Sequence, residues 1–474
     1  MSKIEVNEIV KASGSTLTIG GSGTAVSLGS GATQTGFGRS GAVDWETTIK
    51  TGDFTAENGK GYFINTTGGV ITLTLPASPS AGNIIAIKDY ARKFGTNKLT
   101  IARNGSKMDG EEQNFDFTAD GSSATIIFMD TTKGWSFIND DEVGSMGTKF
   151  VTASGGNATL TSGNFKTHIF TSPGNFVVSD AGNTAGSNTL DYVIVAGGGG
   201  GGRGGSPAYM GGGAGAGGFR LANSVGCLPA PTMSPLATGT AINASAQTYP
   251  IVVGAGGAAA SGDNSAGSNG SVSSGFSLTS AGGGKGAAGG GSPESGGPGG
   301  SGGGSTNAQP AGTGNTPPVS PPQGNPGGVG HPGNNNSGAG GGGAGAAGGG
   351  SPNANRGGDG GIGSFISDNF FGSPNAPTYG TAGPVSSVRY FAGGGSGSSD
   401  GPSSGATPTG GGRPGGSGGG GNGGTGGNPG GVNAGSGTAN TGGGGGGGSG
   451  CCSPGSGNAG AGGSGIVMIR YKFQ

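Results

Sequence analysis

The sequence predicts an all-β protein with thin N-terminal β segments, a small antiparallel β sandwich or barrel, and a β framework that holds a large lattice of polyglycine-II helices. Short apolar stretches recur between turn residues, and no convincing amphipathic helix is found. Most of the 126 glycines lie between Gly197 and Gly465, with an apolar strand pattern at each end, at residues 190–196 and 465–473. A flexible tail needs no strand at its far end, whereas a glycine domain folded between two pairing strands does.

The first domain is expected at residues 1–40. Three short stretches, 3–6, 15–19 and 24–28, alternate with period 2 and are separated by Gly and Ser. None of them can bury a core alone, so we expect several copies of the chain to intertwine here as a homotrimer. A frayed N-terminal arm is the alternative.

The second domain is expected at residues 41–147, where the composition becomes that of an ordinary globular protein. Closely spaced strands separated by turn residues predict an antiparallel sandwich or barrel. The expected strands are 61–65, 70–75, 83–88, 99–102, 124–129 and 134–138. Trp45 and Trp135 are expected as core or rim aromatics of this domain.

The third domain is expected at residues 148–474. Strands are predicted at 150–152, 168–172, 175–178 and 192–195, and the closing strand at 466–473 is expected to pair within this group. The glycine tract is then one large insertion into a small β framework.

The glycine tract needs a special source of order, because glycine loses much backbone entropy on folding and brings no side chain to a core. Collagen is excluded, since it requires glycine strictly at every third position, and residues 325–333 keep that register for three triplets and then lose it. Disorder is the alternative, but apolar stretches at 249–253, 271–278 and 388–392 argue against it. Extended glycine helices with three residues per turn point their N–H and C=O groups outward, so neighbouring helices can satisfy them. Residues 295–304 show this period, with non-glycine residues at 295, 298 and 301.

Charge and composition exclude several functions. The chain has 22 Lys+Arg against 23 Asp+Glu, and only 9% of its residues are charged. We therefore expect no nucleic-acid partner. Apolar runs are of strand length and the N-terminus lacks an apolar segment, so we expect neither membrane insertion nor a signal peptide. The odd count of three cysteines favours reduced thiols over a vicinal Cys451–Cys452 disulfide.

No catalytic motif stands out. Matches to G-x-G-x-x-G are frequent by chance in this tract, and none opens a helix. The acidic pairs Glu111–Glu112 and Asp140–Asp141 lie in polar stretches typical of solvated loops. His168 and His331 are isolated and the cysteines lack zinc-ligand spacing, so we expect no metal, no cofactor and no enzyme activity.

Functional residues are expected where other residue types interrupt the glycine tract. These interruptions are residues 205–210, 306–336 and 365–379. Aromatic, Asn and Ser residues on loops suit recognition of sugars or protein surfaces. The candidate receptor contacts are Tyr209, Met210, Asn334, Asn335, Phe365, Asn369, Phe370, Phe371 and Tyr379. For Phe365, Phe370 and Phe371 the alternative is a small core beneath their loop.

Two sets of short sequence segments resemble segments of phage tail proteins. Residues 61–64, 72–82, 99–105 and 134–135 resemble a β domain that recurs in tail fibres of marine and enterobacterial phages, and residues 4–9 resemble the start of cyanophage-type fibres. Residues 192–199, 211–219, 249–257 and 464–471 are similar to the glycine-rich domain of phage tail proteins. Related polyglycine-II lattices carry the receptor-binding loops of T-even-type fibre-tip adhesins. Those adhesins are separate tip proteins, whereas here a fibre-like N-terminal region and the glycine domain share one chain.

The resemblance implies a bacteriophage tail fibre located in the virion, with residues 1–40 attached to other tail proteins. It implies a homotrimer that binds a host receptor, either a glycan or an outer-membrane protein, through loops of the glycine-rich domain. The main alternative is a structural virion fibre or connector without receptor binding. A tailspike enzyme and a secreted bacterial adhesin are disfavoured by the missing carboxylate cluster and signal peptide.

Overall fold

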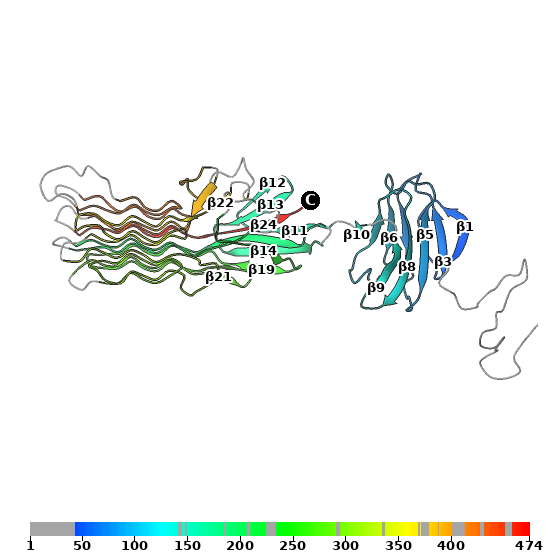
Figure 1. The fold of residues 1–474 in the computed structure, drawn as a ribbon, viewed down its shortest axis with the longest axis horizontal. Coiled ribbons are helices and arrows are strands. Elements are labelled where there is room, and N and C mark those ends of the chain that lie inside the picture. The colour runs from blue at the N-terminus through cyan, green and yellow to red at the C-terminus, as the bar shows by residue number, and fades with distance from the viewer. Residues whose placement is uncertain are drawn as a thin grey trace, which may run out of the picture. The chain divides into compact units, whose positions relative to one another are not determined.

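The computed structural model describes residues 43–140, 145–146, 149–183, 186–205, 209–223, 234–290, 294–333, 337–367, 370, 379–386, 388–400, 413–426, 431–450 and 457–474. The elements of this part are β-strands, which confirms the all-β prediction (Figure 1). The strands expected within residues 1–40 and the three cysteines lie outside the described residues. The chain divides into two compact units, Met1–Gly147 and Thr148–Gln474.

The first unit is a sandwich of two five-stranded sheets around one core. One sheet has the order β1 (Asp44–Lys50), β3 (Lys60–Ile64), β5 (Ile84–Asp89), β8 (Ser123–Asp130), β9 (Gly134–Asp140). The other has the order β10 (Ser145–Met146), β7 (Phe115–Phe117), β6 (Leu99–Ala102), β4 (Ile71–Thr74), β2 (Phe54–Thr55). Alternate residues of both sheets, together with the fully buried Trp135, form the core, while Trp45 is 41% exposed at the rim. Neither sheet closes on itself, so the unit is a sandwich and not a barrel.

The expectation of antiparallel strands is wrong for half of this sandwich. β1, β3 and β5 pair in parallel, and so do β2, β4 and β6. The reason is that the chain changes sheet after every strand from β1 to β5, so successive strands of one sheet run in the same direction up to β6. Only the pairs made by β7, β8, β9 and β10 are antiparallel.

The second unit begins with a β framework. Its main sheet has the order β12 (Ala158–Ser162), β13 (Phe165–Phe170), β24 (Ile466–Lys472), β15 (Thr189–Val195), β16 (Phe219–Ala222), β17 (Ala237–Thr238), and β18 (Ile242–Asn243) also pairs with β15. A second sheet contains β11 (Val151–Ser154), β14 (Gly174–Ala181) and β19 (Thr248–Ile251). Two hairpins complete it: β20 (Ser273–Gly275) with β21 (Leu278–Ser280), and β22 (Ser364–Ser367) with β23 (Val388–Phe391).

The closing strand β24 pairs with β13 and β15, which confirms the prediction that it pairs within this group of strands. Both faces of β15 and β24 are buried, which explains their continuous apolar sequences. Val193, Val195 and Met468 belong to the core on one face, and Ile194 and Ile469 belong to the core on the other.

The glycine lattice extends from the β framework as a set of long parallel segments (Figure 1). It continues directly from β15, and its backbone hydrogen bonds repeat every three residues. The N–H groups of residues 197, 200 and 203 donate to the carbonyls of Ser271, Ser268 and Ser265. Residues 198 and 201 donate to Gly463 and Gly460, whereas residues 199 and 202 donate to Gly215 and Gly212. Three donor directions with period three are the pattern expected of polyglycine-II helices.

Carbonyl groups of the same helix face three further neighbours. The carbonyls of residues 197, 200 and 203 accept from residues 283, 286 and 289. Those of residues 198 and 201 accept from residues 257 and 260, and those of residues 199 and 202 accept from residues 445 and 448. The helix at residues 197–203 is therefore surrounded by six others and forms all its backbone hydrogen bonds with them. The helix at residues 211–216 has the same arrangement, with partners in residues 281–287, 339–342 and 445–448 for its N–H groups.

Glycine is required in these helices because of close approach between backbones. A Cβ added to Gly200 would lie 1.9 Å from the carbonyl oxygen of Ala258, and one added to Gly201 would lie 2.0 Å from that of Gly446. None of the glycines in residues 197–204 has a positive φ, so other residues could adopt their backbone angles. The space between helices, and not the conformation, excludes side chains here.

Other residue types occur where one of the three directions faces solvent. Pro326, Val329 and Pro332 are all exposed along one edge helix, three residues apart. Arg356, Asp359 and Ile362 repeat this spacing on another. Among the non-glycine residues of the three-residue repeat at 295–304, Ser295 and Pro298 are exposed whereas Ser301 is buried.

Candidate functional site

The lattice has one end against the β framework and one end remote from it, here called the distal end. Isolated β-bridges connect neighbouring helices at the distal end: Arg203 pairs with Ser265 and Gly448, and Met210 pairs with Ser449. Polar side chains concentrate there, because the chain turns and some helix positions lose their neighbours. The described distal residues include Arg203, Tyr209, Asp263, Asn264, Asn307, Asn353, Asn355, Arg356, Asn433 and Asn458.

Among the described distal residues Arg203 and Asp263 form an ion pair and the exposed Arg356 does not, so this surface is polar with little net charge. Arg203 contacts the Asp263 carboxylate at 3.1 Å and donates to the side-chain oxygen of Asn458 at 3.0 Å. Arg413 pairs with Asp359 on a neighbouring edge helix. A neutral polar surface suits a receptor recognised through hydrogen bonds and not through net charge.

A small hollow lies at the distal end between Tyr209, Met210, Thr306 and Asn307. Its volume is about 10 Å³, which is room for about one water molecule. This hollow is therefore too small for a sugar ring, and a receptor would contact it only at its surface.

The predicted site residues separate into two groups at opposite ends of the second unit. Tyr209 is half-buried at the distal end, and Met210 beside it is only 1% exposed. Phe365, Phe370 and Tyr379 lie instead with the β framework: Phe365 is on β22, Phe370 belongs to the core that includes Val193 and Met468, and Tyr379 packs against that core. Asn334, Asn335, Asn369 and Phe371 lie outside the described residues. The structure thus does not bring the candidates together as one site.

For Phe370 the core alternative is confirmed. Its side chain is fully buried, and its carbonyl oxygen accepts a hydrogen bond of 2.8 Å from the Thr167 hydroxyl. Phe370 lies 5.5 Å from the Arg470 guanidinium, which is also 3.9 Å from the Phe165 ring. Burial lowers the pKa of Arg470, and the nearby Asp191 carboxylate, 3.9 Å away, opposes this by favouring the charged form. Phe370 therefore supports a buried ion pair of the framework.

Phe365 and Tyr379 are also explained in part by packing. The Phe365 ring is half-buried against Tyr390, with 5.4 Å between ring centroids. Tyr379 packs against the core that contains Phe391, and its carbonyl accepts from Arg389 at 3.0 Å. Met210, with 1% exposure, offers no side-chain surface to a receptor. Among the described candidates, Tyr209 is the one that stays at the distal surface.

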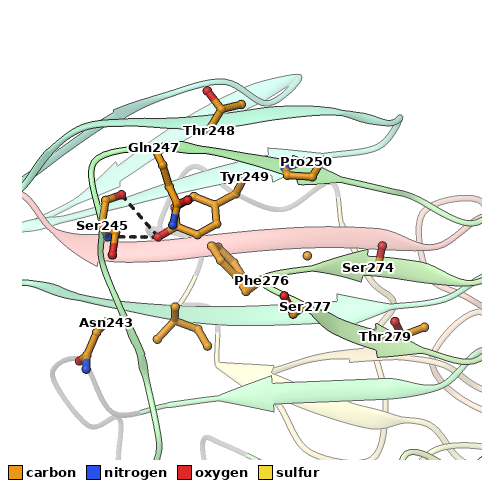
Figure 2. A pocket seen from close by; sticks show the side chains of 12 residues that line it. Asn243, Ser245, Gln247, Thr248, Tyr249, Pro250, Ser274, Phe276, Ser277 and Thr279 are labelled. Atoms are coloured by element: carbon orange, nitrogen blue, oxygen red, sulfur yellow. Dashed lines mark hydrogen bonds between the residues drawn. The ribbon is translucent and has the colours of Figure 1, made fainter.

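Sequence reasoning missed a groove on the β framework, between the chain leading into β19 and the β20–β21 hairpin (Figure 2). It is about 570 Å³ in volume and lies beside Tyr249 and Phe276. In the sequence these residues stood out only as part of the apolar stretches at 249–253 and 271–278, which argue against disorder. The two-residue turn of the hairpin carries Phe-Ser and not the usual Asn-Gly, so the sequence gives no hairpin signal there.

The described residues contain no group of three or more His, Cys, Asp and Glu side chains placed to hold a metal ion. No helix within them is long and apolar enough to cross a membrane.

Fold and site together define a β-framed chain whose folded glycine lattice displays polar residues at its distal end. The chain belongs to the glycine-rich domain family, whose family model matches residues 171–472. This match starts just after β13, ends in β24, and so includes the lattice with most of its framework. No curated protein matches the chain.

Proposed function

We propose that this protein is a bacteriophage tail fibre protein that binds a receptor on the host surface through the distal end of its glycine lattice. The observation that supports this proposal is the closed hydrogen bonding of the lattice interior. Each N–H group of residues 197–203 is bonded to a neighbouring helix, so the lattice is a stiff support. A stiff support holds the distal residues in place before binding and lowers the entropy lost on contact.

In this proposal the receptor is a glycan or an outer-membrane protein of the host. The neutral distal surface favours recognition by Tyr209 and by the exposed Asn353, Asn355 and Asn458. Residues 1–40 attach the protein to other tail proteins of the virion, and three copies form a homotrimer. Three equivalent sites would turn weak single contacts into strong attachment. The protein acts by binding, without catalysis, cofactor or nucleic acid.

The test uses the labelled full-length chain, with host cells that the phage infects and with resistant derivatives. We expect binding to sensitive cells that competes with phage adsorption. A peptide tag inserted after Asn355 at the distal end is matched by the same tag after Ala347, an exposed turn at the framework end. Exposed turns tolerate such insertions. An antibody fragment against the tag should block cell binding only when the tag is distal.

Two results would contradict the proposal. If the folded chain binds no sensitive cells, the alternative hypothesis of a structural virion fibre without receptor binding is favoured. If the antibody fragment blocks binding equally from both tag positions, or only from Ala347, the receptor does not contact the distal end.

A further inference from the structure

The groove beside β19 has the lining of a carbohydrate site. Its residues come from three segments: β18 with the chain that follows it, β19 itself, and the β20–β21 hairpin (Figure 2). None of the lining side chains is charged. Its volume of about 570 Å³ lies within the usual range of small-molecule sites.

Two aromatic rings form the apolar part of the groove. The rings of Tyr249 and Phe276 are 4.9 Å apart at an angle of 59°, and both lie near Phe176 in the core behind them. The Tyr249 hydroxyl accepts a hydrogen bond from the Ser245 backbone N–H at 3.1 Å, which fixes the ring in place (Figure 2). Fixed aromatic rings offer a flat apolar surface, which suits the C–H face of a sugar ring.

Polar groups surround these rings. The side chains of Asn243, Gln247 and Thr279 line the groove and are exposed, and within the described chain they form no hydrogen bond with the protein. Amides and hydroxyls are both donors and acceptors, as sugar hydroxyls are. A lining without charge disfavours nucleic acid and ionic ligands, because their charges would have no partner.

The backbone of the β20–β21 turn is strained, and the residues in the turn are not those that would stabilise the hairpin best. Phe276 and Ser277 have φ angles of +55° and +59°, the left-handed region that side chains rarely adopt. A two-residue turn of this kind prefers Asn-Gly. Phe-Ser instead places the Phe276 ring beside Tyr249. Strained residues of this kind cluster at binding sites, where the surrounding structure holds them.

A second, separate cavity of about 190 Å³ lies next to the groove. Ile242 lines both cavities, and Tyr192 and Arg220 line the second one alone.

We propose that this groove binds a short neutral oligosaccharide, with sugar rings against Tyr249 and Phe276 and sugar hydroxyls bonded to Asn243, Gln247 and Thr279. This site lies on the framework, away from the distal end, and the inference does not depend on the proposed receptor contact there.

The test measures binding of the full-length chain to an array of neutral and acidic bacterial oligosaccharides, followed by titration with the strongest neutral binder. The key variant combines Phe276→Asn with Ser277→Gly, which gives the turn its preferred sequence. We expect binding to fall by about tenfold or more while the thermal midpoint stays equal or rises. Asn243→Ala, at an exposed position, should also weaken binding, whereas Ser271→Ala, exposed and outside the lining, should leave it unchanged.

Three results would overturn the inference. One is that no neutral oligosaccharide on the array is bound, and another is that only acidic ones are. The third is that the turn variant binds as tightly as the parent protein, which assigns the sugar to another surface. If the turn variant instead melts at a much lower temperature, Asn243→Ala decides: unchanged binding refutes the site and weakened binding supports it. If this inference fails, the proposal that the distal end binds host cells is unaffected, because the antibody-fragment experiment tests that end independently.

Discussion

Replacing Gly200 by alanine perturbs the lattice at its centre. The added Cβ would lie 1.9 Å from the carbonyl oxygen of Ala258 and 2.5 Å from its carbonyl carbon. An ordinary contact of this kind is at least about 3.2 Å, so the two helices must separate by about 1.3 Å. Neither Gly200 nor Ala258 can move away from the clash, because the backbones of both residues are hydrogen-bonded to other helices of the lattice.

The cost follows from the bonds that hold these two helices together. Gly257 donates to Gly198 at 2.8 Å, and Ala260 donates to Gly201 at 3.0 Å. Separation by about 1.3 Å breaks both bonds and leaves two buried N–H groups without acceptors, at about 1–3 kcal/mol each. We therefore expect Gly200→Ala to lower the free energy of unfolding of the second unit by about 2–6 kcal/mol.

The assay is denaturant unfolding of the full-length chain, followed by far-ultraviolet circular dichroism. Both tryptophans, Trp45 and Trp135, lie in the first unit, so their fluorescence reports that unit alone and should not change. The matched control is Gly262→Ala, because a Cβ there meets no atom within 4 Å. If Gly200→Ala and Gly262→Ala unfold at the same denaturant concentration, the close-packing account of the glycines is refuted.

Two further predictions concern buried groups of the framework. Asp191→Ala removes the carboxylate that pairs with the buried Arg470 guanidinium, and we expect the free energy of unfolding to fall by about 3–5 kcal/mol. The double variant Asp191→Leu with Arg470→Met should lose much less stability, because no charge is left buried. Equal losses in the two variants would show that the ion pair is not the cause. Burial lowers the pKa of His168, whose Nδ1–H donates to the Gly155 carbonyl at 2.7 Å. The unfolded chain therefore takes up this proton first, so stability should fall as pH drops below about 6.5, by up to about 1.4 kcal/mol per pH unit, until the folded histidine is also protonated. In denaturation curves at pH 7.5 and 5.5, His168→Gln should reduce this loss, and an unchanged pH dependence would contradict the assignment.

Much of the second unit could be predicted because its signals are local or compositional. The apolar strands at 190–196 and 465–473 bracket the glycine tract, and their pairing as β15 and β24 follows from the need to close it. Glycine at period three, as in residues 295–304, predicts helices that share hydrogen bonds. Both predictions had few alternatives, since collagen, which also orders much glycine, requires a strict three-residue repeat that this tract does not keep.

The first unit shows where such reasoning fails. Strand positions were predicted to within a few residues, but pairing direction depends on which sheet receives each strand. That choice comes from packing between sheets, where Tyr62 and Leu73 meet in one core, and it has no local signal. The short strands β2 and β7 carry too few residues to be recognised by period alone.

The candidate site was predicted least well, for a similar reason. Phe365 and Phe370 interrupt the glycine tract, and the sequence cannot tell an aromatic on a loop from one that returns to the core. Phe370 flanks Arg470, which is 100 residues further along the chain. Tyr249 and Phe276 look like strand residues in sequence, and only the fold brings them together at one groove.

Amide hydrogen exchange of residues 197–203 tests the account most directly, because the proposed function depends on a stiff lattice. All seven N–H groups donate to carbonyls of neighbouring helices, and the helix is enclosed by six others. We predict that these amides exchange as slowly as those of β15 and β24 in the same full-length chain. Exchange of residues 197–203 at the rate of an unstructured glycine chain, while β15 and β24 stay protected, would contradict the lattice and the rigid display of its distal end.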